Sequence, residues 1–232
     1  MKIFAIADTH LSGQPPAKPM DVFGEHWRGH WEKIKSDWLR RVGAEDLVLI
    51  AGDISWAMKL TDALCDLEEI SSLPGQKIMV KGNHDYWWQS LSKLSEAVGG
   101  KFFFLQNNFY LAKKIAICGS RGWVCPEDPF FTEKDETVYR RELLRVEASL
   151  QAAQAASPEK IILLLHFPPF PLGKTTSAFV DLIKAYGVSA CVYGHLHMED
   201  YALEGTVVWD GVPYYLVSCD ALGFALREII LP

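Results

Sequence analysis

The stretch KIFAIADTH, residues 2–10, decides how the rest of the chain can be interpreted. It begins with an uninterrupted apolar run over residues 3–7, which is typical of a β-strand covered on both faces. The run ends directly in Asp8-Thr9-His10. If the extended conformation continues, Asp8 and His10 project to the same side, because side chains two residues apart on a strand share a face. The stretch therefore predicts a buried first strand that delivers two convergent polar side chains.

Four further apolar runs end in a polar motif, as the first one does. The runs cover residues 46–51, 77–80, 161–165 and 188–193. The motifs that follow them are Gly52-Asp53, Gly82-Asn83-His84-Asp85, the single His166 and Gly194-His195-Leu196-His197. With the first motif they contain five of the seven histidines of the chain. The histidines are therefore concentrated on turns that follow predicted strands.

Helix-like stretches lie between the apolar runs. They cover residues 25–42, 58–70, 87–98, 132–156 and 177–186. Further strand-like segments cover residues 102–105, 109–111, 115–118, 201–208, 214–217 and 224–230. Asn107-Asn108 and Asp210-Gly211 are turn dipeptides between strand formers, and we predict hairpins at both, the second with a type I′ turn. Together these patterns predict an α/β fold of two mixed β-sheets packed face to face, with helices outside.

The length of the chain, 232 residues, suits one sizeable α/β domain, since a second independent core would be cramped. We expect a single domain over residues 1–232, with an inserted, helical, cap-like segment at about 12–42. Within that segment Trp27, Trp31, Ile34 and Trp38 recur at spacings of four, three and four, so they share one helix face. We expect this face to pack the helix onto the body, although a helix placed directly after the first motif could also roof the site.

Composition and charge exclude several classes of protein. The net charge is −6 and no long block of Lys or Arg is present, so we do not expect duplex nucleic acid as a partner. No apolar stretch approaches the ~20 residues of a membrane helix, and the first apolar run is too short for the core of a signal peptide. The five cysteines lack a CxxC pair and are expected to be reduced thiols. We therefore expect a cytoplasmic protein without a membrane span.

The polar motifs offer oxygen and imidazole donors without thiolates, a combination that suits Mn, Fe, Zn or Co. Asp53 has two carboxylate oxygens that can bridge two cations. Seven donors are available in all: Asp8, His10, Asp53, Asn83, His166, His195 and His197. With one shared carboxylate they provide about four donors for each of two metals, which leaves room for a bridging hydroxide and a substrate. Two metals about 3.5–4 Å apart can hold the attacking and leaving oxygens of a phosphoryl displacement.

The ordered motifs from Asp8 to His197 resemble those of the calcineurin-like metallophosphoesterase superfamily, in its branch of small bacterial-type phosphohydrolases and phosphodiesterases. The resemblance implies a four-layer α/β/β/α sandwich with a dinuclear site at the carboxyl ends of the strands. It also implies that one metal is bound by Asp8, His10, Asp53 and His197, and the other by Asp53, Asn83, His166 and His195. By the same resemblance, His84 contacts the phosphoryl group and protonates the leaving oxygen, a role that suits the ordinary pKa of histidine, ~6.5.

The sequence departs from the protein serine/threonine phosphatases of that superfamily. Those proteins read Gly-Asp-x-Val-Asp-Arg-Gly at the second motif, whereas this chain reads Gly52-Asp53-Ile54-Ser55-Trp56. The arginine that grips phosphate in that subgroup is absent, so we do not expect protein phosphatase activity.

Several residues near the motifs have two open interpretations. Arg121, in a glycine-flanked turn, could reach a substrate phosphate or be an ordinary surface arginine. Asp85 could orient His84 or satisfy backbone donors of its turn. His26 and His30 are four apart and could clasp a metal, but without a third ligand we expect a solvated helix face. The aromatic residues beside the motifs are expected to pack, although one or two rings could stack a nucleobase.

These observations predict a dinuclear, metal-dependent phosphoesterase that hydrolyses a phosphomonoester or phosphodiester through a metal-bridging hydroxide, with His84 as the acid. The expected partner is a small phosphate-ester substrate, and the oligomeric state stays open. Within enzymes, a nucleotide or cyclic-nucleotide phosphodiesterase is an alternative. The alternative outside enzymes is a catalytically silent scaffold for protein interaction, which would have little reason to keep His84 and the complete donor set. A nuclease acting on DNA ends would require a basic groove.

Overall fold

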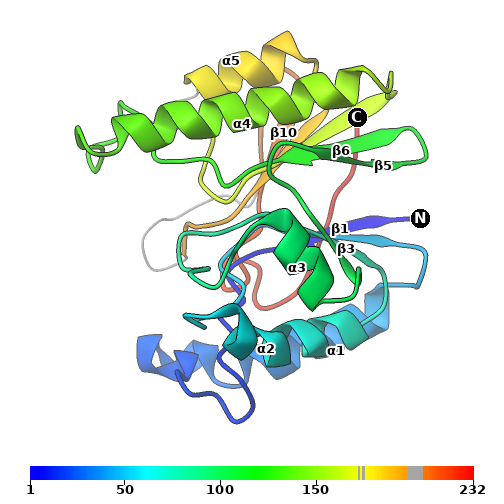
Figure 1. Ribbon diagram of the computed structural model, residues 1–232, viewed down its shortest axis with the longest axis vertical. Helices are drawn as coiled ribbons and strands as arrows, with labels where there is room; N and C mark the ends of the chain where they lie inside the picture. Colours follow the sequence, from blue (N-terminus) through cyan, green and yellow to red (C-terminus); the bar gives the residue numbers. More distant parts are fainter. Residues whose placement is uncertain (172, 174–175, 198–205) are drawn as a thin grey trace.

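The computed structural model of the 232-residue chain describes residues 1–171, 173, 176–197 and 206–232. Two β-sheets lie face to face between two groups of helices, and both ends of the chain lie on the same side of the molecule (Figure 1). The first sheet has five strands in the order β11-β1-β2-β3-β4. Their bounds are β1 (Ile3–Ile6), β2 (Leu47–Ile50), β3 (Gln76–Met79), β4 (Phe102–Phe104) and β11 (Arg227–Glu228). Strands β1 to β4 are parallel, and β11 is antiparallel to β1.

The second sheet has six strands in the order β5-β6-β7-β8-β10-β9. Their bounds are β5 (Phe109–Ala112), β6 (Ile115–Gly119), β7 (Lys160–Leu164), β8 (Ala190–Tyr193), β9 (Thr206–Trp209) and β10 (Val212–Leu216). The four inner strands are parallel and the two edge strands are antiparallel to their neighbours. Both sheets are therefore mixed, as predicted.

Helices cover the outer face of each sheet. The first sheet carries α1 (His30–Arg41), α2 (Leu60–Ser72) and α3 (Leu91–Ala97). The second sheet carries α4 (Glu136–Gln154) and α5 (Ala178–Ala185), which lie together at the top of Figure 1. Short 3-10 helices η1 (Met20–Phe23) and η2 (Glu25–Trp27) precede α1. All five predicted helices are present: α2 is shifted by two residues, and the other four are shorter than predicted, with α1 beginning five residues later.

Alternation along the strands explains the four layers. In β1, Ile3 and Ala5 face the second sheet, whereas Phe4 and Ile6 pack against the helices of the first. In β7, Ile162 faces the first sheet in the same way, with no exposed surface. Because both faces of these strands are covered, the runs read as continuously apolar rather than alternating. The α/β/β/α architecture predicted from the sequence is confirmed.

One of the two predicted hairpins is correct. Asp210 and Gly211 join β9 to β10 with φ of 48° and 79°, which is the left-handed backbone of a type I′ turn. The hairpin predicted at Asn107-Asn108 is wrong, because β4 belongs to the first sheet and β5 to the second. The Asn108 amide instead accepts from Gln106 N at 2.9 Å and donates to Phe104 O at 3.1 Å, which turns the chain from one sheet to the other. Part of the strand predicted at 201–208 lies outside the described residues; β9 accounts for its end.

The segment at 12–42 packs against the first sheet through its aromatic stripe. Trp27, Trp31, Ile34 and Trp38 are all buried, as the spacing predicts. The Trp38 indole donates to Pro74 O at 2.9 Å, which ties α1 to the end of α2. The single-domain assignment and the cap-like role of this segment remain expectations.

Two sequence expectations concern thiols and membranes. All five cysteines are free, with Cys65 exposed and the other four buried. Among the described residues, no helix combines the length and the apolar character needed to cross a bilayer.

The layer between the sheets should dominate stability. Ile117 in β6 is fully buried there, so Ile117→Ala should lower the free energy of unfolding by about 2–5 kcal/mol, the usual cost of such a cavity. Leu111 in the adjacent strand β5 is 43% exposed, so Leu111→Ala should lower the free energy of unfolding by much less. Urea unfolding followed by circular dichroism measures both; equal losses would contradict the assigned position of the core.

Candidate metal centre

The polar motifs meet at the carboxyl ends of the parallel strands. Motif residues follow β1, β2 and β3 in the first sheet and β7 and β8 in the second. In open α/β sheets this edge is where ligands are bound, because the strand ends present loops to a common crevice. Here the two sheets contribute to one cluster, since His166 Nε2 of the second sheet lies 3.6 Å from Asp53 Oδ1 of the first.

Two groups of side chains are close enough to hold cations. Asp8, His10 and His197 place one donor atom each within 4.8 Å of one another. Asp8, Asp53 and His166 do the same. The two groups share Asp8, so the possible sites are adjacent.

Asp53 lies among the imidazoles. Its Oδ2 is 4.0 Å from the Nε2 atoms of both His10 and His84, and its Oδ1 is 3.6 Å from that of His166. A carboxylate with a different histidine facing each oxygen has the geometry that a bridging ligand needs. The bridging role that the resemblance implies for Asp53 remains a prediction that this placement supports.

Polar atoms without partners indicate what the cluster is built to hold. Asp8 Oδ1 and His10 Nδ1 are buried, and neither has a hydrogen-bond partner among the described residues. Buried polar atoms are almost always satisfied, so such atoms point to an unfilled ligand or ion site. Carboxylate, amide and imidazole donors fit a divalent cation such as Mn, Fe, Zn or Co.

His166 is prepared as a neutral ligand. Its Nδ1 lies 2.8 Å from Ala51 O, a carbonyl that can only accept, so the proton is on Nδ1 and the Nε2 lone pair is free. Nε2 then lies 2.6 Å from Asn83 Oδ1, so that two acceptors face each other as the amide is placed. A cation bound by both atoms would relieve this contact. Burial lowers the pKa of His166 to about 3 and that of His195 to about 2, so both are neutral at pH 7.

The carboxyl groups of the cluster are shifted in the opposite direction. Asp8 and Asp53 are almost completely buried, and burial raises the pKa of both. Each would be more stable as an anion with a cation beside it. Burial raises the pKa of Asp53 more than the charges of His197 and Arg121 lower it, so a divalent cation would supply further compensation.

Asp220, which follows β10, was not found from the sequence. Its Oδ1 lies 3.1 Å from His197 Nδ1, the carboxylate–histidine contact that commonly orients a metal ligand. Burial lowers the pKa of His197, but the hydrogen bond to Asp220 and the charge of Asp8 outweigh it and raise the pKa to about 9. No motif surrounds Asp220 in the sequence, so only the three-dimensional structure reveals it.

The motif backbones are strained where they deliver their side chains. Asp8, His10, Asp53 and His195 have φ of 59°, 46°, 51° and 73°, in the left-handed region that residues other than glycine rarely adopt. The extended geometry predicted for Asp8-x-His10 is therefore wrong, and the side chains converge through left-handed turns after β1 ends at Ile6. Such strain costs roughly 1–3 kcal/mol per residue and typically marks functional sites.

Asp85 connects the second and third motifs through hydrogen bonds to their backbones. Its Oδ2 accepts from Asp53 N at 2.9 Å and Gly82 N at 2.8 Å, and its Oδ1 accepts from Ile54 N at 2.9 Å and the Trp87 indole at 3.0 Å. Neither oxygen bonds the His84 ring among the described residues, so the orienting role considered for Asp85 gives way to the backbone-satisfying one.

Gly82 allows the second and third motifs to approach closely. A Cβ at this position would lie 2.0 Å from Asp53 Oδ1 and 2.2 Å from Asp53 N. Any side chain at Gly82 would thus displace Asp53, which explains why the third motif begins with glycine.

His84 is a half-buried histidine of the cluster. Its backbone N donates to Asp53 Oδ1 at 2.8 Å, whereas 38% of its side chain is exposed. The ring centroid lies 4.6 Å from that of Trp56 and 5.9 Å from that of His10. His84 is therefore fixed by its backbone and free to offer Nε2 to a bound molecule.

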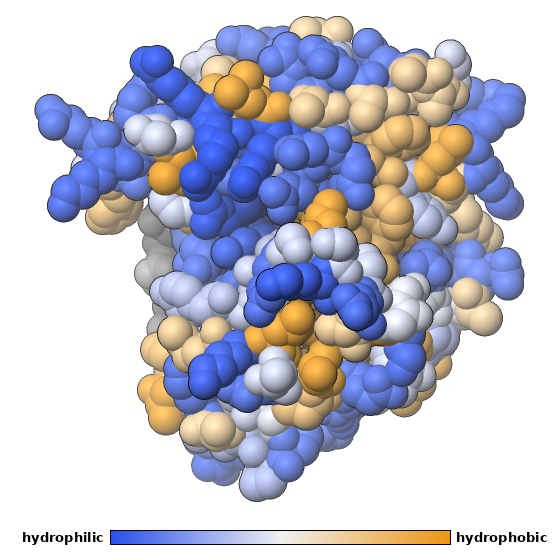
Figure 2. Space-filling model, in the orientation of Figure 1, coloured by the Kyte–Doolittle hydropathy of each residue, from blue (hydrophilic) through white to orange (hydrophobic). Residues whose placement is uncertain are grey.

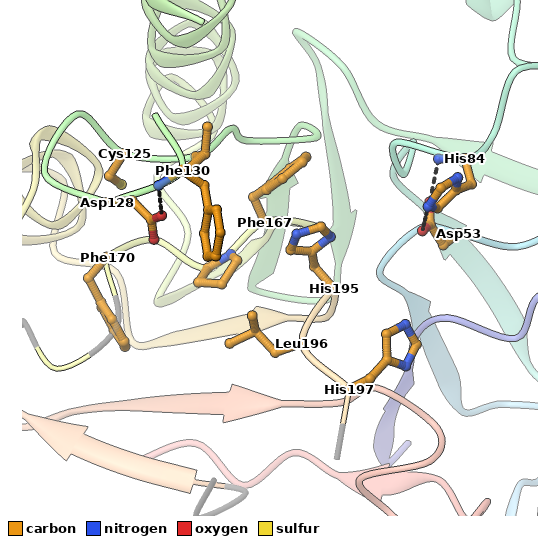
Figure 3. Close-up of a pocket in the computed structure, with 12 residues that line it drawn as sticks. Asp53, His84, Cys125, Asp128, Phe130, Phe167, Phe170, His195, Leu196 and His197 are labelled. Carbon is orange, nitrogen blue, oxygen red and sulfur yellow. Dashed lines mark hydrogen bonds and ion pairs between the residues drawn. The ribbon is translucent and has the colours of Figure 1, made fainter. Parts of the chain in front are cut away.

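Two cavities open onto the cluster, and His84 and His197 line both. The first, about 500 Å³, is called here the phenylalanine cavity. Its other lining residues are Asp53, Val124, Cys125, Asp128, Phe130, Phe167, Pro168, Phe170, His195 and Leu196. Figure 3 shows its three phenylalanines on the opposite side of His195 from Asp53 and His84. The second, about 330 Å³, is called the tryptophan cavity, and its other lining residues are His10, Met20, Phe23, Trp27, Trp56 and Asp220.

Two sequence candidates lie beside the candidate donor groups, and the backbone of one contacts them directly, since Arg121 O accepts from His166 N at 3.0 Å. Arg121 stacks on Trp123 at 4.2 Å, pairs with the buried Glu142 at 3.4 Å and lines a separate cavity of about 200 Å³. It lines neither cavity at the cluster, so contact with a substrate phosphate remains untested. The solvated face expected for His30 is wrong: its ring is buried, with Nε2 2.9 Å from Thr9 O, and it fixes the helical segment to the first motif.

Comparison with known proteins identifies the family and the fold. The model of one protein family, described as calcineurin-like phosphoesterase, matches residues 1–199. No curated protein matches the chain. Among solved structures, TT1561 of Thermus thermophilus is similar, with a TM-score of 0.61, 12% identity, and coverage of 98% of this chain and 97% of the other. At these identities the structural likeness shows the fold alone.

Two further structures have the same fold. Phosphopantetheinyl hydrolase from Mycobacterium tuberculosis has a TM-score of 0.58 and 15% identity, with 99% of this chain and 95% of the other covered. The calcineurin-like phosphoesterase YfkN from Bacillus subtilis has a TM-score of 0.52 and 15% identity, with 94% and 81% covered.

Asp85→Asn should disrupt the centre without changing the size of the side chain. An amide NH₂ would face backbone N–H donors where a carboxylate oxygen now accepts, so we expect a loss of about 1–3 kcal/mol for each bond broken. Urea unfolding measures the stability, and elemental analysis measures the metal content per chain. Asp181→Asn on the exposed face of α5 is the control. Unchanged stability and metal content in Asp85→Asn would contradict the assigned role.

Metal binding should tighten as the pH rises towards 9. His197 holds a proton below its pKa of about 9, and a cation that binds Nε2 or Nδ1 must displace that proton, so affinity rises with pH and levels off above this value. Calorimetric titration of metal-stripped protein in buffers of different ionisation enthalpy measures affinity and proton release together. Asp220→Asn removes the bond that favours the proton and should shift the rise to lower pH. An affinity independent of pH would contradict this assignment.

Proposed function

The chain belongs to the calcineurin-like phosphoesterase family, and we propose that it hydrolyses phosphoric esters with the help of two divalent cations. The observation that carries the proposal is the buried donor cluster at the carboxyl ends of the strands of both sheets. Asp8 belongs to both groups of potential ligands, and the Asp53 carboxylate lies within 4.0 Å of three imidazoles. The buried Asp8 Oδ1 and His10 Nδ1 support it, since neither atom has a hydrogen-bond partner among the described residues.

The chain would divide the cations between two donor sets. One set is Asp8, His10, Asp53 and His197, and the other is Asp53, Asn83, His166 and His195. When bound, the cations supply the Lewis acidity of the reaction, because they lower the pKa of the attacking water and neutralise the phosphoryl oxygens. Mn, Fe, Zn and Co all suit these donors.

The protein itself positions the ligands and the proton. Asp85 holds the turns that carry Asp53 and Asn83, and Ala51 O fixes the tautomer of His166. His84 lines both cavities beside the cluster and would donate the proton of its ring to the leaving oxygen. Its placement 4.0 Å from Asp53 Oδ2 keeps this proton next to the site where the ester would be bound.

A catalytically silent scaffold is the competing interpretation. Such a protein would gain nothing from four strained motif residues or from two buried atoms without partners. These features destabilise the fold unless a bound ion compensates for them, and they therefore favour the enzyme.

Metal-dependent turnover is the decisive test. Metal-stripped protein should hydrolyse p-nitrophenyl phosphate, bis-p-nitrophenyl phosphate or both only after Mn, Fe(II), Zn or Co is restored. Elemental analysis should then find two cations per chain. Failure to hydrolyse either ester or any other phosphoric ester while two cations are bound would support the scaffold instead.

His84→Ala should slow hydrolysis most for esters with poor leaving groups. Protonation by His84 matters little when p-nitrophenolate leaves, since this anion is stable, and matters greatly when an alkoxide must leave. We expect losses of about 10²–10⁴-fold in kcat for alkyl esters and much smaller losses for p-nitrophenyl esters. Steady-state kinetics with both kinds of ester, with and without added imidazole, measure the effect. Equal losses for both would indicate that His84 binds substrate without acting as the acid.

A further inference from the structure

The candidate centre lies where two cavities meet. His84 and His197 line both the phenylalanine cavity and the tryptophan cavity, and no other described residue lines both. A phosphoryl group beside His84 therefore has space on two sides. A phosphomonoester carries one organic group and fills one of these spaces, whereas a phosphodiester carries two.

One wall of the phenylalanine cavity is formed by Phe130, a side chain outside the hydrophobic core. Phe130 is 75% exposed, although burial would stabilise such a side chain by about 1.5–3 kcal/mol. A hydrogen bond within its own loop fixes the backbone of this residue: Phe130 N donates to Asp128 Oδ1 at 2.9 Å, as the dashed line in Figure 3 marks. Phe167 continues this wall to the cluster, with its ring centroid 4.2 Å from that of His195.

The tryptophan cavity is also lined by aromatic and apolar side chains. Trp56 stacks on His10 with centroids 4.6 Å apart, and its indole donates to Met20 Sδ at 3.3 Å. Trp27 lies 5.9 Å from His197, and Phe23 at the end of η1 is 55% exposed. The cap-like segment therefore supplies apolar surface beside the centre and leaves part of it open to solvent.

Charge distinguishes these two cavities from their surroundings. Among the described residues, neither is lined by Lys or Arg, and each contains a carboxylate outside the candidate donor sets, Asp128 in one and Asp220 in the other. The cationic side chains gather in the separate cavity of Arg121, with Lys81, Arg141 and Arg145. Figure 2 shows that hydrophilic and hydrophobic side chains lie in distinct groups on one face of the molecule. Among the described residues that line these cavities, an anionic substituent would meet no lysine or arginine, although Lys18 Nζ lies 5.4 Å from the Trp56 ring.

We propose, on the basis of the proposed function, that the substrate is a phosphodiester in which both esterified alcohols carry uncharged, apolar or aromatic groups, one for each cavity. Hydrolysis adds the oxygen of one water to phosphorus and breaks the P–O bond to one alcohol. One proton of that water leaves to solvent, and the leaving oxygen takes its proton from His84. The products are the free alcohol and a phosphomonoester that keeps the second group.

A set of p-nitrophenyl esters with one common leaving group tests the proposal. The metal-loaded protein is given p-nitrophenyl phosphate and its diesters with a methyl, a phenyl or a carboxyphenyl group as the second substituent. The leaving group is constant, and dividing kcat/KM by the uncatalysed hydrolysis rate of each ester removes its intrinsic reactivity, so the remaining differences report on how the protein accommodates the second substituent. We expect the phenyl diester to exceed the methyl diester by at least about tenfold, which corresponds to about 1.4 kcal/mol. The carboxyphenyl diester should be no better than the methyl one.

Substitution of two exposed phenylalanines, one in each cavity, tests the two cavities one at a time. Phe130→Ala and Phe23→Ala each remove one wall without touching a candidate metal donor. One of them should abolish the preference for phenyl over methyl, since its cavity receives the second substituent. The other should lower kcat/KM for both diesters equally, since its cavity receives the nitrophenyl group. Leu144→Ala, at a 66% exposed position on α4 away from both cavities, is the control and should change neither quantity.

The outcomes separate this inference from the proposed function. Metal-dependent turnover with phenyl and methyl diesters cleaved equally, or with the monoester preferred, would overturn the inference and leave the phosphoesterase standing. A preference for the carboxyphenyl diester would overturn the assignment of uncharged groups. Absence of metal-dependent turnover with every ester would overturn the proposed function and the inference together.

Discussion

The carboxylate of Asp85 accepts hydrogen bonds from the backbone of both the second and the third motif, and the position of the candidate centre depends on these bonds. The two motifs follow neighbouring parallel strands, and their turns would otherwise separate, because each carries backbone donors that cannot reach a strand partner. A buried carboxylate with four or more such donors is satisfied only in this one arrangement. The rigid backbone thus places Asp53, and Asp53 in turn accepts from His84 N and faces three imidazoles.

The buried charges of the candidate centre destabilise the metal-free protein, and bound cations would stabilise it. Burial raises the pKa of Asp8, Asp53 and Asp85 and lowers that of His10, His166 and His195, so the site is most costly when its carboxylates are ionised without a counter-charge. Divalent cations would supply that counter-charge and would also satisfy the acceptors that face one another at His166 and Asn83. The metal centre and the stability of this edge of the sheets are therefore linked.

The sequence predicted the strands and their motifs because both signals are local: an apolar run is visible without its partners, and a polar motif directly after it marks a strand end. The turn at Asn107-Asn108 was misjudged because turn chemistry shows where a chain reverses but not which sheet it joins next. Asp220 was missed for a related reason, since a single acidic residue after a strand has no motif until His197 is seen beside it. The walls formed by Phe130 and Phe23 belong to irregular segments, where exposed aromatic residues follow no periodicity.

The left-handed backbone of Asp8, His10, Asp53 and His195 has a consequence for how relatives of this protein can change. Each position would be more relaxed with glycine, so the donor side chains persist only while something selects for the ions they hold. A duplicated copy released from that selection could become more stable by losing its donors one at a time. Donor residues at these four positions therefore indicate that selection still maintains the centre. Glycine at the same positions would mark relatives that kept the fold and lost metal binding.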